Sequence, residues 1–131
     1  MSPAFDPTNL EDVFRRIVDL FNGQNFDQLQ PFLHPQVTMN RVDDPGSKQG
    51  IGPVIDYLKT TQTTLKPKFE PDYAQVNFPE LPIGHVEVSG PAGWRDRTDI
   101  SVTPITVKFI FTLTRANPGD RWLVIRTWAH R

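Results

Sequence analysis

The sequence contains no cysteine, and no run of apolar residues approaches the length of a membrane span. Without cysteine there is neither a disulfide framework nor a thiolate metal ligand or nucleophile. A transmembrane helix needs about 18 consecutive apolar residues, so we expect no membrane association. The N-terminus, Met1 to Pro7, lacks the basic and apolar regions of a signal peptide. We therefore expect a cytoplasmic protein, although the absence of cysteine fits the periplasm equally well.

A strong excess of charge is also lacking, since the formal net charge is −1. Residues 90–131 are mildly basic, with seven Lys and Arg against three Asp. These basic residues are scattered, whereas a nucleic-acid-binding surface needs a clustered basic stripe. We interpret them as solvated charge at strand edges and turns, and we expect no nucleic-acid partner.

The C-terminal part of the chain carries the clearest pattern. Asn117-Pro118-Gly119-Asp120 is a turn sequence, and the β-branched and aromatic run Trp122 to Trp128 follows it. The two sides of the turn predict a long antiparallel hairpin. The strand before the turn alternates with period two, which is typical of one buried face. The residues on that face are Ile105, Val107, Phe109, Phe111 and Leu113.

The rest of the chain predicts helices first and strands after, which favours an α+β domain with the helices on one sheet face. We see no repeat or linker, so residues 1–131 are interpreted as a single domain. Helices are expected over 8–22, 25–33 and 50–58, strands over 37–42, 73–78 and 83–89, and a turn over 90–97. The expected core includes Ile17, Phe21, Ile55, Leu58, Phe109 and Phe111.

Element order and local sequence together resemble the NTF2-like superfamily, which includes SnoaL-like proteins and ketosteroid isomerases. The resemblance rests on Asn22-Gly23 after the first helix, Phe32-Leu33-His34-Pro35 after the second, and the loop Asp43 to Ser47. Gly50 to Leu58 and Trp122 to Ile125 fit the third helix and the last strand. The resemblance implies a cone-shaped, cystatin-like α+β barrel. In it, N-terminal helices pack on a curved, mostly antiparallel sheet, which wraps the third helix and leaves a deep apolar cavity.

Within this superfamily, Asp44-Pro45-Gly46-Ser47 resembles the stretch that carries the catalytic base of ketosteroid isomerase, with one residue missing. Asp44 is accordingly the first candidate for a base, and its alternative role is to bond the local backbone in a turn. Counting without a gap puts Arg41 at the base position instead. Thr106 or Val107 replaces one of the isomerase's oxyanion donors, and Ile17 replaces the other. Steroid isomerisation is therefore not expected.

Other candidate site residues come from the strand pattern. His85 is the second candidate for an acid or base, and its alternative is a surface position. Asn40 and Arg41 lie on opposite faces of the first strand, so one of them is expected to face the cavity. Arg126 and Trp128 are expected to share a face with Trp122 and Val124. If that face is concave, Arg126 anchors a ligand oxygen; if it is convex, the pair belongs to a dimer interface.

Two functions remain open from the sequence. The first is a SnoaL-like enzyme that acts without a cofactor as an isomerase, cyclase or dehydratase on an apolar ligand. The second is a non-catalytic module that binds a hydrophobic small molecule or a protein partner. Tyr57 and Thr106 complete the candidate ligand contacts, and no metal site is expected because the three histidines are far apart in sequence. Apolar residues on both faces of the long strand predict a homodimer.

Overall fold

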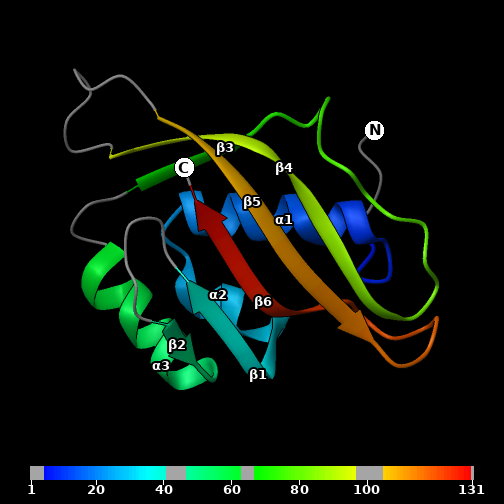
Figure 1. Cartoon of the computed structure of the whole chain (residues 1–131). Helices are drawn as coiled ribbons and strands as arrows, with labels where there is room; N and C mark the ends of the chain where they lie inside the picture. The colour runs from blue at the N-terminus through cyan, green and yellow to red at the C-terminus, as the bar shows by residue number, and fades with distance from the viewer. Residues whose placement is uncertain (1–4, 41–46, 63–66, 97–104, 131) are drawn as a thin grey trace.

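The computed structural model describes residues 5–40, 47–62, 67–96 and 105–130, and in these ranges it shows helices packed on one curved sheet (Figure 1). The predicted α+β class is confirmed. No helix in the described ranges is long and apolar enough to cross a membrane. The elements are α1 (Leu10–Asn22), α2 (Phe26–Leu29), the 3-10 helix η1 (Gln30–Phe32), β1 (Leu33–Asn40), β2 (Ser47–Gln49), α3 (Ile51–Tyr57), the π-helical turn η2 (Leu58–Gln62), β3 (Pro67–Pro71), β4 (Gly84–Asp96), β5 (Ile105–Arg115) and β6 (Leu123–His130).

The sheet has the strand order β2-β1-β6-β5-β4-β3. β1 runs parallel to β6, and every other neighbouring pair is antiparallel. The predicted hairpin of β5 and β6 lies at its centre. Its turn is closed by a hydrogen bond from the Asp120 amide to the Asn117 carbonyl (3.0 Å).

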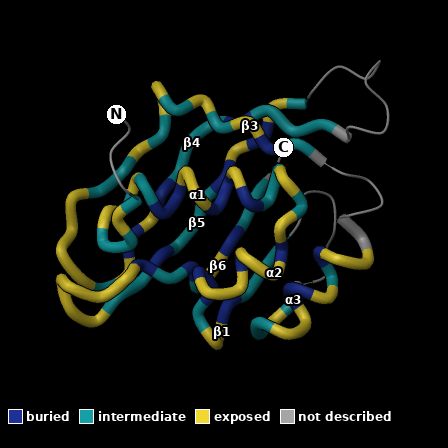
Figure 2. The backbone as a smooth tube through the Cα atoms, turned by 180° about the vertical axis from the view of Figure 1, so that it is seen from behind, coloured by how far each residue is buried: buried dark blue, intermediate teal, exposed yellow. Residues whose placement is uncertain are grey.

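One face of the sheet is covered by α1, which crosses behind β4, β5 and β6 in Figure 1. α1 is amphipathic, so buried and exposed positions alternate along it in the view from behind (Figure 2). The expectation that the sheet wraps the third helix is wrong, because α3 packs beside β1 and β2 instead. The predicted core is confirmed: Ile17, Ile55, Leu58 and Phe109 are buried, and Phe21 and Phe111 pack against them.

Aromatic rings join α1 to the inner face of the sheet. Phe14, which is fully buried, stacks on Phe109 with ring centroids 5.5 Å apart and meets Phe111 edge to face at 5.5 Å. Tyr73 and Phe78, from the segment between β3 and β4, contact the same ring edge to face. Such pairs add about 0.5–1.5 kcal/mol each beyond burial, so Phe14 is the main attachment of the helix.

The predicted strand over residues 73–78 is wrong. Residues 73–75 form a turn, and only Asn77 bridges to another strand, opposite Ser89. The reason is Asp72, whose carboxylate accepts hydrogen bonds from the Ala74 amide (3.2 Å) and the Gln75 side chain (2.6 Å). An Asp side chain that bonds the backbone two residues on stabilises a turn in preference to a strand.

The predicted turn over residues 90–97 is also wrong as far as it is described, because β4 continues straight through Gly90 to Asp96. Gly90 is needed for close approach rather than for turning: a Cβ there would lie 3.1 Å from the Val76 Cα and 3.2 Å from the Gln75 carbonyl oxygen. The added length of β4 pairs with β3 over residues 92–96.

A β-bulge in β6 corrects the predicted facing of the last strand. Arg126 stands opposite Thr112 and Val124 opposite Leu113, so Ile125 has no partner. One unpaired residue reverses the alternation beyond it. Arg126 and Trp128 therefore do not share a face with Val124, and Thr127 takes the inner side in their place.

The end of the hairpin is tied to the N-terminal segment by Arg115 and Trp122. The Arg115 guanidinium lies over the Trp122 ring, 4.3 Å from its centroid, and donates to the carbonyls of Thr8 (2.9 Å) and Pro82 (2.7 Å). The Trp122 indole also donates to the Thr8 carbonyl (3.1 Å). These contacts fix the chain where it enters α1.

Truncation of the central ring tests this packing. Phe109 is 1% exposed and touches rings from α1, β3 and β5. We expect Phe109→Ala to lower the free energy of unfolding by about 3–5 kcal/mol, through lost burial and a new cavity. Ile83→Ala, at a residue that is 47% exposed, is the control and is expected to change it by less than about 0.5 kcal/mol. Equal midpoints in urea for Phe109→Ala and the unchanged protein would contradict the assigned facing of β5.

Candidate functional site

A cavity of about 80 Å³ lies between the second half of α1 and the inner face of the sheet. α1, α2 and η2 form one wall, and five of the strands form the other. The lining consists almost wholly of apolar side chains. Its residues are Ile17, Val18, Phe21, Leu29, Leu33, Met39, Asn40, Leu58, Phe69, Trp94, Phe111, Val124, Thr127, Trp128 and Ala129.

Aromatic rings shape one side of this cavity. Trp94 lies between Phe21 of α1 and Phe69 of β3, with centroid distances of 5.9 and 6.3 Å. Phe69 in turn stacks on Phe111 at 5.8 Å. The four rings come from α1 and from strands β3, β4 and β5, and each contacts the next. Together they form an aromatic wall on this side of the cavity.

The polar groups of the lining are few. Asn40, Thr127 and the indole N–H groups of Trp94 and Trp128 are the polar groups in it, and none of the described lining residues carries a charge. Thr127 is 8% exposed and is the polar residue that the described part of the chain buries most completely. The cavity therefore offers hydrogen bonding at one end and apolar contact elsewhere.

Among the described residues, two groups have a shifted pKa, and both lie away from the cavity. Hydrogen bonds from the Thr8 hydroxyl and the Thr8 amide lower the pKa of the Asp6 carboxyl. Burial raises the pKa of the Tyr73 hydroxyl, although the Arg15 guanidinium 3.9 Å from the ring centroid opposes that shift. Neither group is placed to act on a molecule in the cavity.

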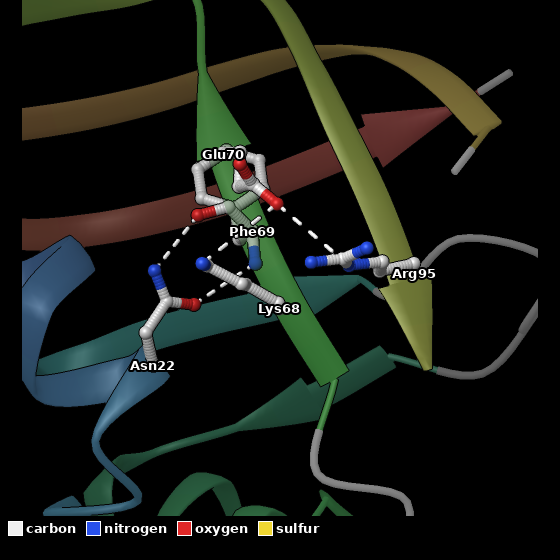
Figure 3. A network of polar contacts seen from close by, with 5 residues as sticks. All are labelled: Asn22, Lys68, Phe69, Glu70 and Arg95. Carbon is white, nitrogen blue, oxygen red and sulfur yellow. Dashed lines mark hydrogen bonds and ion pairs between the residues drawn. The ribbon is translucent and has the colours of Figure 1, made fainter. Parts of the chain in front are cut away.

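The aromatic wall is anchored from outside by Asn22, the last residue of α1 (Figure 3). Its side-chain amide donates to the Phe69 carbonyl (2.8 Å), and its side-chain oxygen accepts from the Phe69 amide (2.9 Å). β3 is an edge strand, so Asn22 supplies the donor and the acceptor that a further strand would supply. This pair of bonds fixes the depth of the Phe69 ring in the cavity.

Charged residues flank the same strand. The Glu70 carboxylate lies 3.8 Å from Arg95 Nε and 4.0 Å from Lys68 Nζ (Figure 3). These separations are ion pairs rather than hydrogen bonds, and Arg95 Nε is buried without a hydrogen-bond partner among the described residues. Partly exposed pairs of this kind stabilise a fold little, so the network is a rim of mixed charge beside the cavity.

The structure brings two of the predicted site residues to the cavity, Asn40 and Trp128. Trp128 belongs to the wall between Thr127 and Ala129, although its cross-strand partner is Ile110. Arg41 and Asp44 lie outside the described residues. The position of the first candidate base is therefore not part of the described site.

Four other predicted site residues lie elsewhere. His85, Thr106 and Arg126 are exposed and are not in the lining, because each stands on the strand side opposite the buried residues. Tyr57 is half-buried, with the Lys48 ammonium 5.2 Å from its ring centroid. Within the described chain, no cluster of three or more His, Cys, Asp or Glu is placed to hold a metal ion.

Sequence reasoning missed Trp94, Phe69 and Thr127 as cavity residues. Trp94 was predicted in a turn, and only the continuation of β4 beyond Gly90 places it inside. Simple alternation of side chains from Val124 places Thr127 on the outer face, and only the bulge at Ile125 brings it to the inner one. Phe69 had an available signal, since it stands between two charged residues, Lys68 and Glu70, as expected for a strand with one buried side.

This architecture defines an α+β protein with the NTF2-like, cystatin-like fold. An NTF2-like protein with a cystatin-like fold from Novosphingobium aromaticivorans matches with a TM-score of 0.67 and 13% identity, over 91% of this chain and 77% of that one. A protein from Catenulispora acidiphila solved in complex with S-DNPA matches at 0.67 and 13%, over 92% and 89%. A protein from Sinorhizobium meliloti, provisionally named a polyketide cyclase, matches at 0.61 and 14%, over 95% and 99%.

These likenesses establish the fold and not the activity, because the identities are low. No family model matches the sequence, and no curated protein matches it.

Proposed function

We propose that this protein binds a small apolar molecule in the cavity between α1 and the sheet. The observation that carries the proposal is the lining itself, in which aliphatic and aromatic side chains surround a space with no charged group among the described residues. Ligand pockets are typically apolar cavities with a few placed polar groups. That the Catenulispora acidiphila protein was solved with a bound small molecule is consistent with this use of the fold.

The size of the cavity supports occupation by more than water. Its volume of about 80 Å³ exceeds the ~10–15 Å³ that one water needs, and an apolar lining gives water few partners. Apolar walls make fewer packing contacts wherever no atoms lie against them. A ligand of one-ring size would make those contacts. It would also gain about 25 cal/mol of binding free energy for each Å² of its apolar surface that leaves water.

Filling the cavity from the protein side tests the proposal. Ala129 lines the cavity, so Ala129→Leu places three more carbon atoms in it. We expect p-xylene, titrated by NMR, to bind the unchanged protein and to bind Ala129→Leu at least about tenfold more weakly. The leucine side chain occupies the space that the ligand needs, and forcing both into it costs about 1–3 kcal/mol. Ala116→Leu, at an exposed turn residue, is the matched control and should bind p-xylene normally. Failure of p-xylene to bind the unchanged protein would sink the proposal.

A second function, proton transfer in the same cavity, is favoured by the position of Asn40. β1 ends at Asn40, which lines the cavity, and Asp44 follows four residues later in the sequence. We propose Asp44 as the base of a cofactor-independent isomerase, cyclase or dehydratase of the SnoaL-like kind. No described lining residue offers a titratable group that could act as the base in its place.

Hydrogen exchange on a ketone tests this second function. We expect the protein to exchange the α-hydrogens of 4-methylcyclohexanone in D₂O faster than buffer, as followed by NMR. Asp44→Asn should then lose about 10²-fold or more of that rate, the typical contribution of a general base. Asp56→Asn, at an exposed residue of α3, serves as the control. Equal exchange rates for the Asp44 and Asp56 variants would remove Asp44 from the assignment.

We further propose a homodimer that forms through the outer face of the sheet. Ile110 is half-buried within the single chain and stands between Ser89 and Trp128 on the neighbouring strands. Apolar side chains at the centre of a sheet face, with polar residues around them, are typical of the core of an interface. Arg126, exposed nearby, suits the rim.

The dimer is tested by sedimentation at micromolar concentration. We expect the unchanged protein to sediment as a dimer and Ile110→Lys to sediment as a monomer, because a buried unpaired charge opposes association. Gln28→Lys adds the same charge at an exposed position of α2 and should leave the dimer intact. A monomeric unchanged protein would disprove the interface.

A further inference from the structure

The side chain of Thr127, which lines the cavity, makes no hydrogen bond to the described part of the protein. The residue is 8% exposed. A hydroxyl that the protein leaves without a partner can donate a hydrogen bond to another molecule or accept one from it. The Thr127 hydroxyl oxygen is not one of the fully enclosed side-chain atoms that lack a partner. It is therefore accessible from the cavity that Thr127 lines, where it can bond to water or to a ligand oxygen.

The strand pairing on both sides of Thr127 places this residue on the cavity face of the sheet. Its partner on β5 is Phe111 and its partner on β1 is Met39, and both of these residues also line the cavity. Residues that stand opposite one another on neighbouring strands share a face of the sheet. The unpaired Ile125 keeps Thr127, rather than Arg126, on this inner side. The bulge thus presents a neutral hydroxyl to the cavity and turns a guanidinium away from it.

Asn40 adds a second hydrogen-bonding group close by. It follows Met39, which stands opposite Thr127, and it lines the same cavity. A hydroxyl donates or accepts one bond readily, and an amide offers both kinds of group. Together they make one polar end in a cavity whose remaining described lining is apolar apart from the indole N–H groups of Trp94 and Trp128.

We propose that Thr127 is the hydrogen-bonding anchor of the ligand, and that the ligand is an uncharged, ring-sized apolar molecule with one hydroxyl or carbonyl oxygen. This inference rests on the proposed binding function and specifies its ligand class. The oxygen would pair with the Thr127 hydroxyl, and the ring would lie against Phe69, Trp94 and Phe111. A carboxylate is disfavoured because no described lining residue could neutralise it, and burial of an unpaired charge is far more costly than burial of a hydroxyl.

Two probes of one size, and a third in which a larger charged carboxylate replaces the methyl or hydroxyl group, separate these requirements. p-Xylene and p-cresol differ only in a methyl group and a hydroxyl, and 4-methylbenzoate carries a charge. We expect the protein to bind p-cresol and p-xylene but not 4-methylbenzoate, in NMR titrations. Thr127→Val should weaken p-cresol binding about three- to tenfold, the usual effect of one neutral hydrogen bond, and leave p-xylene binding unchanged. Thr127→Ser keeps the hydroxyl and should retain the preference for p-cresol over p-xylene that Thr127→Val loses.

The outcomes distinguish this inference from the function on which it rests. If p-xylene and p-cresol both bind but Thr127→Val leaves their affinity ratio unchanged, Thr127 is not the anchor while the cavity still binds ligands. If 4-methylbenzoate binds more tightly than p-cresol, the uncharged ligand class is wrong. If p-xylene does not bind the unchanged protein, the binding function fails and this inference with it. If Thr127→Val no longer binds p-xylene, that substitution has disrupted the cavity, and Thr127→Ser becomes the test. Loss of the preference for p-cresol over p-xylene in Thr127→Ser would then disprove the proposed role of Thr127.

Discussion

The contact between Phe14 and the rings of β5 is the interaction on which the other features of this protein depend. It places the middle of α1 on the inner face of the sheet. About one turn and two turns further along the helix, Ile17 and Phe21 reach the cavity, and Asn22 at the helix end reaches the backbone of β3. A helix that lay elsewhere would close neither the cavity nor the sheet edge. Packing at the first half of α1 thus positions the site at its second half.

The same protein combines a dense core and an open space, and the division between them follows side-chain size. Around Phe14, rings from β5 and from the segment between β3 and β4 fill the space between helix and sheet. Beyond Phe21 the facing residues of β6 are small, Thr127 and Ala129, and the space stays open. Larger residues at those two positions would pack more tightly and stabilise the fold. Their small size is therefore a feature of the site rather than of the core.

Most of the fold was predictable from the sequence because hydrophobic periodicity reports burial directly. The alternation along β5 and the helical spacing in α1 identified Phe109 and Ile17 as core residues, and both are buried. The errors came from interactions distant in sequence or from local side-chain bonds. Gly90 is read as a turn residue from composition alone, whereas its real constraint is the backbone of Val76. Asp72 converts the following segment into a turn by two hydrogen bonds that a propensity scale does not include.

The candidate site was less predictable than the fold. Of the predicted residues, Asn40 and Trp128 reach the cavity, whereas His85 and Arg126 are exposed. Successive side chains of a strand point to alternate faces of the sheet. One unpaired residue such as Ile125 therefore reverses the predicted face of every residue that follows it in the strand. Resemblance to enzymes of the same fold also directed attention to titratable residues. The described cavity is instead built from side chains that no catalytic motif marks.

The two hydrogen bonds from Asn22 to β3 also bear on how copies of this protein behave at high concentration. A net charge of −1 gives little electrostatic repulsion between molecules, so the chain cannot rely on charge to remain dispersed. Open strand edges are the usual starting points of amyloid-like aggregation. One outer strand, β2, spans only Ser47–Gln49, and the other, β3, has its free backbone groups at Phe69 occupied by Asn22. Colloidal stability in this protein therefore depends on the protection of its sheet edges, and one amide side chain at the end of a helix provides an essential part of it.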